Sequence, residues 1–282
     1  MKKFEPIRAY DDDGLIIPDI GTWGQKKYKL VGHYANIFTS AMKNKWNLVY
    51  LDLFAGAGYA RIKGTKQILG SSSLISLMIS NKFDYYIFNE LDTEKFRALK
   101  KRISRLKEYN ESTISIINCN ANSDIEEILS HIPRQTGSMR RNLCFCFLDP
   151  FSLNLEYKTV EKLAENKMDI LLLLALQMDA KRNFEVYLNE QSEKIELLLG
   201  NSHWRNDFKA GGYRKQEFVK FLSDQYDVSM KKLGYHTNIP KERIVNTVGQ
   251  GIYYLAFYSR HELGGEFFNK IRQAADDQLK MF

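Results

Sequence analysis

Short apolar runs alternate with longer amphipathic segments through the middle of the chain. The runs are rich in branched and aromatic side chains, so each predicts a buried strand. The predicted strands are 48–53, 85–88, 115–118, 143–148 and 169–175. The segments between them predict helices at about 70–81, 93–109 and 158–165, and one that follows the polar run 120–124 and reaches residue 131. This order predicts an α/β fold with a mostly parallel sheet and helices on both of its faces.

The two ends of the chain have different patterns. Residues 1–21 are irregular, and Thr22 is a candidate cap for a helix whose apolar stripe reaches Met42. After Leu176 a polar, mainly helical segment predicts an insertion over about 177–214, followed by a helix at 215–233. Strands at 243–248 and 252–259 flank Gly249-Gln250-Gly251, which indicates an antiparallel hairpin, and a last helix is expected at 265–281.

These elements predict the domain organisation. We expect an N-terminal arm and helix over 1–46 and one domain over 47–282 that contains the inserted helices. Its sheet has seven strands, with the C-terminal hairpin as the antiparallel part. The loop expected at 59–69 carries Arg61, Lys63 and Lys66.

Composition indicates the kinds of partner, metal site and compartment to expect. The chain has 282 residues, a net charge of +7 and a sequence pI near 9.1, which favours polyanionic partners. Its three cysteines lack metal-ligand spacing, so we predict buried thiols in a reducing compartment and no metal site. The longest apolar run, 170–176, is too short to span a bilayer. A cytoplasmic protein without a membrane partner is expected.

A glycine turn follows the first predicted strand. The run Asp52-x-Phe54-Ala55-Gly56-x-Gly58 lets a ligand approach the backbone, because glycine has no Cβ and tolerates positive φ. A dinucleotide fingerprint needs a third glycine, and a phosphate-binding P-loop needs Gly-Lys-Ser/Thr, and neither is present. The run is similar to the first motif of class I S-adenosylmethionine-dependent methyltransferases. The alternative is a tight strand-to-helix turn without a ligand.

Polar residues follow the other predicted strands. Glu90 is placed to accept ribose hydroxyls, with Asp92 as an alternative and a solvated strand end as the plain interpretation. Asn120 and Ala121 are expected beside an adenine, whereas Asn122 is equally suited to cap a helix.

The end of the fourth predicted strand carries a third motif. Asp149-Pro150-Phe151 resembles the acid- or amide-Pro-aromatic motif of methyltransferases that act on amino nitrogens. An oxygen acceptor orients the N–H of such a substrate, and an aromatic ring stacks on a flipped base. The chain has a single Pro where the adenine- and cytosine-modifying enzymes have two. The alternative is an ordinary turn after a strand.

Taken together, these motifs resemble the three-Cys-motif partner (TcmP) family from about Trp23 onward. The matching segments are Tyr50–Gly58, Gly70-Ser71, Phe88-Asn89-Glu90, Phe147–Phe151, Arg182-Asn183 and Tyr253–His261. The chain departs from the family at Ser73, Asn120 and Ser152, where Pro, an acid and Gly are common. The resemblance implies a Rossmann-like methyltransferase fold and a protein partner encoded nearby.

Basic residues suggest where a nucleic acid binds. One set lies on the helix at 93–109, and a second set, Lys26, Lys27, Arg61, Lys63 and Lys66, lies near the carboxyl edge of the sheet. The alternative for each is a solvated face, and Trp204 is either a stacking ring or a core residue.

We therefore expect a methyltransferase that uses S-adenosylmethionine and acts on an amino nitrogen of a base in DNA or RNA. The alternatives are a non-catalytic binding protein of the same fold and a methyltransferase for proteins or small molecules.

Overall fold

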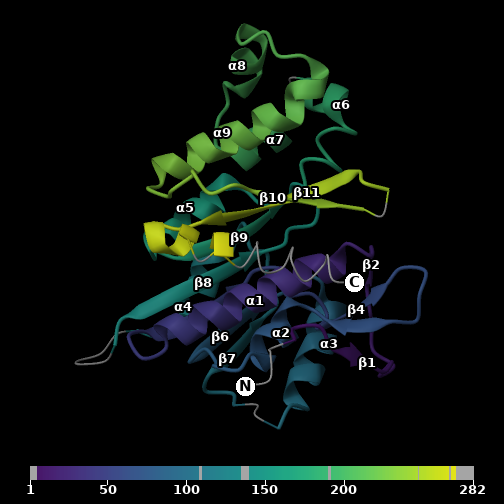
Figure 1. Ribbon diagram of the computed structural model, residues 1–282, viewed down its shortest axis with the longest axis vertical. Helices are drawn as coiled ribbons and strands as arrows, with labels where there is room; N and C mark the ends of the chain where they lie inside the picture. Colours follow the sequence, from purple (N-terminus) through teal and green to yellow (C-terminus); the bar gives the residue numbers. More distant parts are fainter. Residues whose placement is uncertain are drawn as a thin grey trace.

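The computed structural model describes residues 5–107, 110–134, 140–189, 192–246, 248–266 and 268–270. A seven-stranded sheet runs through the centre of the molecule in the order β10-β11-β9-β8-β3-β6-β7 (Figure 1). Its strands are β3 (Asn47–Asp52), β6 (Tyr85–Asn89), β7 (Ile114–Ile117), β8 (Asn142–Leu148), β9 (Asp169–Leu174), β10 (Glu242–Val245) and β11 (Gly251–Tyr258).

The sheet is parallel except at β11. The pairs β3·β6, β3·β8, β6·β7 and β8·β9 are parallel, whereas β11 is antiparallel to both β9 and β10. The predicted strands and the C-terminal hairpin are confirmed, and the mostly parallel sheet is consistent with a Rossmann-like methyltransferase fold. The sequence did not show that β11 lies between β9 and β10.

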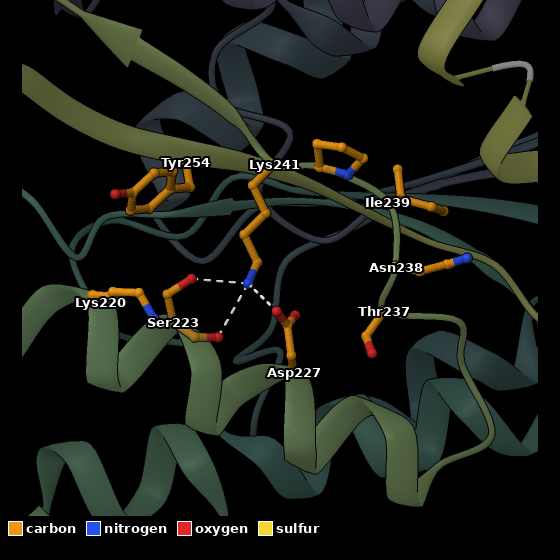
Figure 2. A pocket seen from close by; sticks show the side chains of 9 residues that line it. Lys220, Ser223, Asp227, Thr237, Asn238, Ile239, Lys241 and Tyr254 are labelled. Carbon is orange, nitrogen blue, oxygen red and sulfur yellow. Dashed lines mark hydrogen bonds and ion pairs between the residues drawn. The ribbon is translucent and has the colours of Figure 1, made fainter.

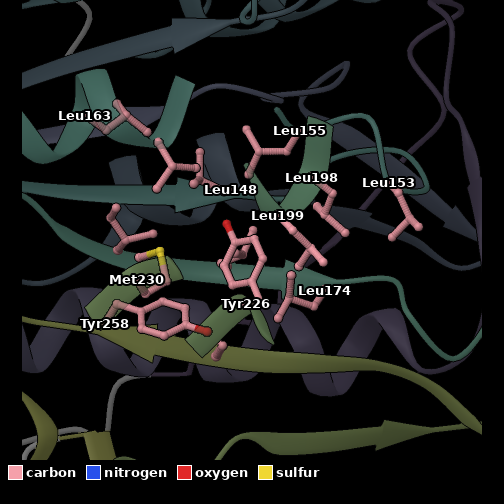
Figure 3. Close-up of a cluster of buried hydrophobic side chains, with 14 of the residues drawn as sticks. Leu148, Leu153, Leu155, Leu163, Leu174, Leu198, Leu199, Tyr226, Met230 and Tyr258 are labelled. Carbon is pink, nitrogen blue, oxygen red and sulfur yellow. The ribbon is translucent and has the colours of Figure 1, made fainter. Parts of the chain in front are cut away.

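Helices cover both faces of this sheet because its strands are apolar on both sides. Side chains alternate along each strand, so Cys144 and Cys146 of β8 face one core while Phe145 and Phe147 face the other. The face with the phenylalanines packs against α1 (Gly24–Met42), α2 (Ser72–Met78) and α3 (Thr93–Ser104). The opposite face packs against α4 (Ile125–Ser130), α5 (Tyr157–Glu165), α7 (Lys194–Leu199) and α9 (Phe218–Lys232). Figure 3 shows part of this second core, where Tyr226 and Met230 of α9 lie against sheet leucines.

The inserted segment after β9 packs on the second core. It contains α6 (Phe184–Leu188), α7 and α8 (Trp204–Ala210), and the 3₁₀ turn η1 (Lys215–Glu217) leads into α9. Trp204 is fully buried, 5.9 Å from the ring of Phe218, so the core interpretation of this residue is the right one. Figure 2 shows how α9 is tied to the chain before β10: the amine of Lys241 bonds the backbone and hydroxyl of Ser223 and the carboxylate of Asp227.

A second, four-stranded sheet has the order β1-β5-β4-β2 and was not predicted. The segment expected as a basic loop forms the hairpin β4 (Tyr59–Ile62) and β5 (Ile68–Gly70). The arm expected to be irregular supplies β1 (Ala9–Tyr10) and β2 (Asp19–Ile20), one on each side of the hairpin. The alternation was short, and the basic residues at its exposed positions obscured it.

Arg102 fixes the arm to the glycine turn. Its guanidinium group donates to both carboxylate oxygens of Asp13, at 3.0 and 2.6 Å, and to the carbonyls of Ile16 and Ala57. It also lies over the ring of Tyr59, 4.2 Å from its centroid. One cation of the predicted basic helix is therefore a buried structural residue.

The helix ends also differ from prediction. Helix α1 begins at Gly24 after Trp23, whose side chain forms no cap, so Thr22 is not the cap. Helix α3 ends at Ser104, five residues before the predicted end, and part of that stretch lies outside the described residues. Residues 262–266 and 268–270 are helical, and the remainder of the predicted last helix also lies outside them. Among the helices that the structure describes, none has the length and apolar character to cross a membrane.

Candidate functional site

The strand order of the sheet reverses at β3, and a cavity lies at this point. The chain passes from β3 to β6 and β7 on one side and then returns to β8 on the other side of β3. Ligands of open parallel sheets bind beyond the carboxyl ends of the strands at such a point. A cavity of about 610 Å³ lies there, lined by residues that follow β3, β6, β8 and β9. This volume is typical of a small-molecule site.

The glycine turn after β3 forms one wall of this cavity. Gly56 and Gly58 both have positive φ, +67° and +87°, which explains the choice of glycine. A Cβ on Gly56 would meet no protein atom within 4 Å, whereas one on Gly58 would lie 3.2 Å from Leu99. Gly56 lines the cavity and Gly58 does not. Gly56 therefore leaves space on the ligand side, and Gly58 allows close packing on α3.

Glu90, at the end of β6, binds the turn directly. Its Oε2 accepts a hydrogen bond from the amide of Gly56 at 2.8 Å, and its Oε1 accepts one from the amide of Asp92 at 2.9 Å. Asp92, the alternative ribose ligand, instead caps α3 by accepting from the amides of Glu94 and Lys95. Glu90 lines the cavity and holds the glycine turn in place.

Asp52 lies behind the turn and is fully buried. It accepts hydrogen bonds from the hydroxyl of Ser72 at 2.6 Å and from the amide of Phe54 at 3.2 Å. Burial raises the pKa of Asp52 to about 7, against the two hydrogen bonds, which lower it, and with help from the charges of Asp149 and Glu90. Its charge therefore changes near neutral pH.

Asp149, after β8, pairs with Lys27 of α1. The lysine Nζ is 2.6 Å from Oδ2 of Asp149, and the side chains are 4% and 25% exposed. Burial alone lowers the pKa of Lys27, but the charge and hydrogen bond of Asp149 outweigh it and hold the pKa above its usual range. The other oxygen, Oδ1, accepts no hydrogen bond from a described residue. Lys27 thus fixes one oxygen of Asp149, and the other oxygen keeps its lone pairs.

The residues after Asp149 open the cavity to solvent. Pro150 is buried, but the side chain of Phe151 is 85% exposed, an unusual state for a phenylalanine. Ser152 has a φ of +60°, a conformation that favours glycine, and this is a position where the resembled family often has Gly. The turn therefore holds an aromatic ring at the mouth of the cavity.

Most of the predicted site residues come together here. Those that line the cavity are Phe54, Ala55, Gly56, Glu90, Asp149, Pro150 and Phe151. Asn120 and Ala121, predicted beside an adenine, do not line it. Asn120 is exposed and accepts from the amide of Asn122, and Ala121 is part of the core. Asn122 fastens α5 by accepting from the amide of Glu156 and the hydroxyl of Thr159, a structural role.

Five basic residues were predicted near the carboxyl edge of the sheet, and three of them are paired with acids. Lys26 pairs with Glu242 at 2.6 Å, Lys27 pairs with Asp149, and Arg61 pairs with Asp12. Lys63 and Lys66 are exposed on the β4–β5 hairpin. Their contribution to a nucleic-acid surface stays a prediction.

Sequence reasoning missed several walls of the cavity. Pro18 to Gly21 of the arm, Tyr28 of α1 and Tyr253 of β11 line it, as do Asp179, Arg182 and Asn183 after β9. A signal for Lys27 was present in the sequence, because it falls four residues before Val31 on the apolar stripe of α1. A lysine at a core position needs a buried partner, and an acid at the sheet edge provides one.

Comparison with known proteins gives the following results. No protein-family model and no curated protein matches the sequence. Similar solved structures include a conserved hypothetical protein of Streptococcus pyogenes, with 17% identity, a TM-score of 0.31, and coverage of 50% of this chain and 76% of that one. A Legionella pneumophila protein of family model DUF519 has 11% identity, a TM-score of 0.47, and coverage of 87% and 90%. The N-terminal domain of human METTL16 in complex with SAH has 10% identity, a TM-score of 0.37, and coverage of 82% and 68%. These likenesses are too distant to identify a family.

Proposed function

We propose that this protein is a methyltransferase that uses S-adenosylmethionine and acts on an amino nitrogen of a nucleic-acid base. One observation carries the proposal. The glycine turn with Glu90 and the Asp149-Pro150-Phe151 turn lie on the walls of the same cavity, at the switch point of the sheet. The wall that we propose for the donor and the wall that we propose for the acceptor therefore face one cavity.

The residues of the cavity suit the donor. S-adenosylmethionine supplies an electrophilic methyl group on a sulfonium when it is bound. The free space at Gly56 lets a ligand approach the backbone, and the lone pairs that Glu90 keeps beside its two amide bonds are available to hydroxyl groups. The carboxylate of Glu90, which lines the cavity, favours the positive charges of the donor.

The opposite wall suits an amine acceptor. Oδ1 of Asp149 accepts an N–H of the substrate, and Lys27 prevents the carboxylate from rotating. The nitrogen lone pair then points away from Asp149 and toward the methyl group. Phe151 provides the ring on which a base stacks. Rate acceleration comes mainly from this alignment and from exclusion of water, because the amine needs no strong base before it attacks.

Calorimetric titration with S-adenosylmethionine tests the donor half. We expect Gly56→Ala to weaken binding at least tenfold, since the new Cβ occupies the ligand side of the turn. Gly64→Ala is the matched control: Gly64 also has a positive φ, +78°, and free space around it, but it does not line the cavity. Both changes cost about 1–2 kcal/mol of strain, so only the loss of affinity separates them. Absence of binding to the unchanged protein would refute the proposal.

Transfer of a labelled methyl group tests the acceptor half. DNA, RNA, protein and small-molecule pools are incubated with the protein. Asp149→Ala removes the oxygen acceptor, so we expect it to lose more than a hundredfold in rate while it still binds the donor. Label in protein alone would replace the nucleic-acid substrate with a protein substrate. Donor binding without label in any pool would favour a non-catalytic protein of this fold.

A further inference from the structure

A second cavity adjoins the first and has a different character. It has a volume of about 770 Å³ and lies between the segment after β9 and the β10–β11 hairpin. Met178 and Arg182 line both cavities, so the two are neighbours at the sheet edge. In Figure 1 the tip of this hairpin extends beyond the sheet. We call this second cavity the hairpin groove.

The hairpin groove carries positive charge without compensation. Lys181, Arg182 and Arg243 line it, and no carboxylate does. All three side chains are exposed, and none of them forms a hydrogen bond or ion pair with a residue that the structure describes. Lys26, Lys27 and Arg61, in contrast, each pair with a carboxylate. Such a set of cations favours a ligand with several negative charges.

Other residues that line the groove hold its two segments in place by hydrogen bonds. Gln177 donates to the hydroxyl of Tyr254 at 3.1 Å, which fixes the start of the inserted segment on β11. Asn246 accepts from the amides of Val248 and Gln250, which closes the hairpin turn. The cations are therefore carried on two segments held at a defined separation.

The exposed ring of Phe151, near the groove, helps to distinguish between classes of polyanion. Phe151 is exposed at the mouth of the first cavity, and Met178, at the junction, is 42% exposed. The charged side chains of an acidic peptide carry no flat ring, whereas each nucleotide of a nucleic-acid strand carries both a phosphate and a base that can stack on Phe151. A strand with its phosphates in the groove has a base within reach of the first cavity.

We propose that the hairpin groove binds the phosphodiester backbone of the strand whose base enters the methyl-transfer cavity. This proposal rests on the function proposed above, and it assigns the substrate contact to Lys181, Arg182 and Arg243. In this arrangement the basic face of α3 and the lysines of the β4–β5 hairpin contribute little or nothing to strand binding.

Counterion release gives the expected effect. Each lost phosphate contact on a single strand changes the slope of log K against log salt by about 0.7. Losing two contacts therefore reduces the slope by about 1.4 and lowers the affinity roughly 25-fold at 0.1 M salt. Lys181 and Arg243 are suitable for removal together, because both line the groove and neither lines the first cavity.

The experiment measures fluorescence anisotropy of labelled 20-nucleotide single-stranded DNA, single-stranded RNA and duplex DNA between 50 and 200 mM KCl. The variant is Lys181→Gln with Arg243→Gln. The matched control is Lys100→Gln with Lys101→Gln, which removes the same charge from the exposed face of α3. Donor affinity is measured by calorimetry on the same samples.

We expect the groove variant to lose about 25-fold in strand affinity and about 1.4 in salt slope, with donor affinity unchanged and the α3 control within threefold of the unchanged protein. Comparison of the three probes then identifies DNA or RNA. Equal losses in both variants, no loss in the groove variant, or binding of a polyglutamate probe but no nucleic acid would overturn the proposal. Strand binding that depends on the groove in a protein that binds no S-adenosylmethionine would leave the groove standing and refute only the methyltransferase function.

Discussion

Replacing Arg102 by Met tests whether the arm is held on the glycine turn by one buried guanidinium group. The side chain of Arg102 is 1% exposed and makes four hydrogen bonds, two to Asp13 and one each to the carbonyls of Ile16 and Ala57. Methionine keeps the volume of the side chain and removes every one of these bonds. Arg105 pairs with the same carboxylate at 3.2 Å but is 49% exposed. It is therefore a matched control.

The expected magnitudes differ because the two arginines differ in burial. Removing one partner of a buried ion pair costs about 3–5 kcal/mol. Arg105 remains near Asp13, so we take the lower end, about 3 kcal/mol, for Arg102→Met. An exposed pair contributes less than about 1 kcal/mol after solvent screening, and this is the expectation for Arg105→Met. With an unfolding entropy of about 2.1 cal/mol/K per residue, these changes lower Tm by about 5 °C and by less than about 2 °C.

The assay is thermal unfolding at pH 7 and below pH 4. The hydrogen bond from Arg102 lowers the pKa of Asp13, against burial, which raises it. A lowered folded-state pKa contributes stability above the unfolded value of about 3.9, and this stability is lost as the pH falls below it. The difference between Arg102→Met and the unchanged protein should therefore shrink in acid. Equal small shifts for the two variants at pH 7 would show that Arg102 does not hold the arm.

Three further predictions concern the cavity. Because the pKa of Asp52 is raised, its contribution to stability is fully present below about pH 4 and is lost as the pH rises through about 7. In urea unfolding, the stability of Asp52→Asn relative to the unchanged protein should therefore increase by on the order of 3 kcal/mol between pH 4 and 8. A difference that stays constant with pH would contradict this. Lys27→Met should lower stability by about 3 kcal/mol and slow methyl transfer. Lys26→Met removes a lysine whose side chain is more exposed, so it should lower stability by less than about 1 kcal/mol and leave the rate unchanged; similar effects of the two variants would refute the role of Lys27. Ser152→Gly should raise stability by about 0.5 kcal/mol, because the relief of strain at a positive φ outweighs the greater entropy of glycine in the unfolded chain. A loss of stability in chemical denaturation would show that the turn is not strained.

The central sheet was predictable because each strand is a short apolar run with a polar end. Val49 to Asp52 and Phe145 to Leu148 are buried on both faces, so the sequence shows a continuous apolar signal. In a parallel sheet the polar residues at these ends meet at one edge. From this rule alone, the sequence predicts that Glu90 and Asp149 lie close together, and both line the same cavity.

The arm and its partners were not predictable by the same rule. The strands at Ala9 and Asp19 have two residues each, too few to show a period, and they pair only with a hairpin far along the chain. The ion pair of Lys27 and Asp149 spans 122 residues, and local pattern contains no information about such a contact. Asn120 was misleading because a strand-end amide suits both ligand binding and a turn, and here its oxygen closes the turn.

The bonds of Arg102 also have a consequence for the order of folding. Asp13 and Arg102 are 89 residues apart, and β1 pairs with a strand that begins at Ile68, so the wall formed by the arm depends on long loop closures. We therefore expect residues 9–20 of the arm to be among the last to reach their final positions. Until they do, the cavity is open along one side. A ligand that touches this wall binds only the completed state, so it should slow amide exchange in residues 9–20 more than in the sheet.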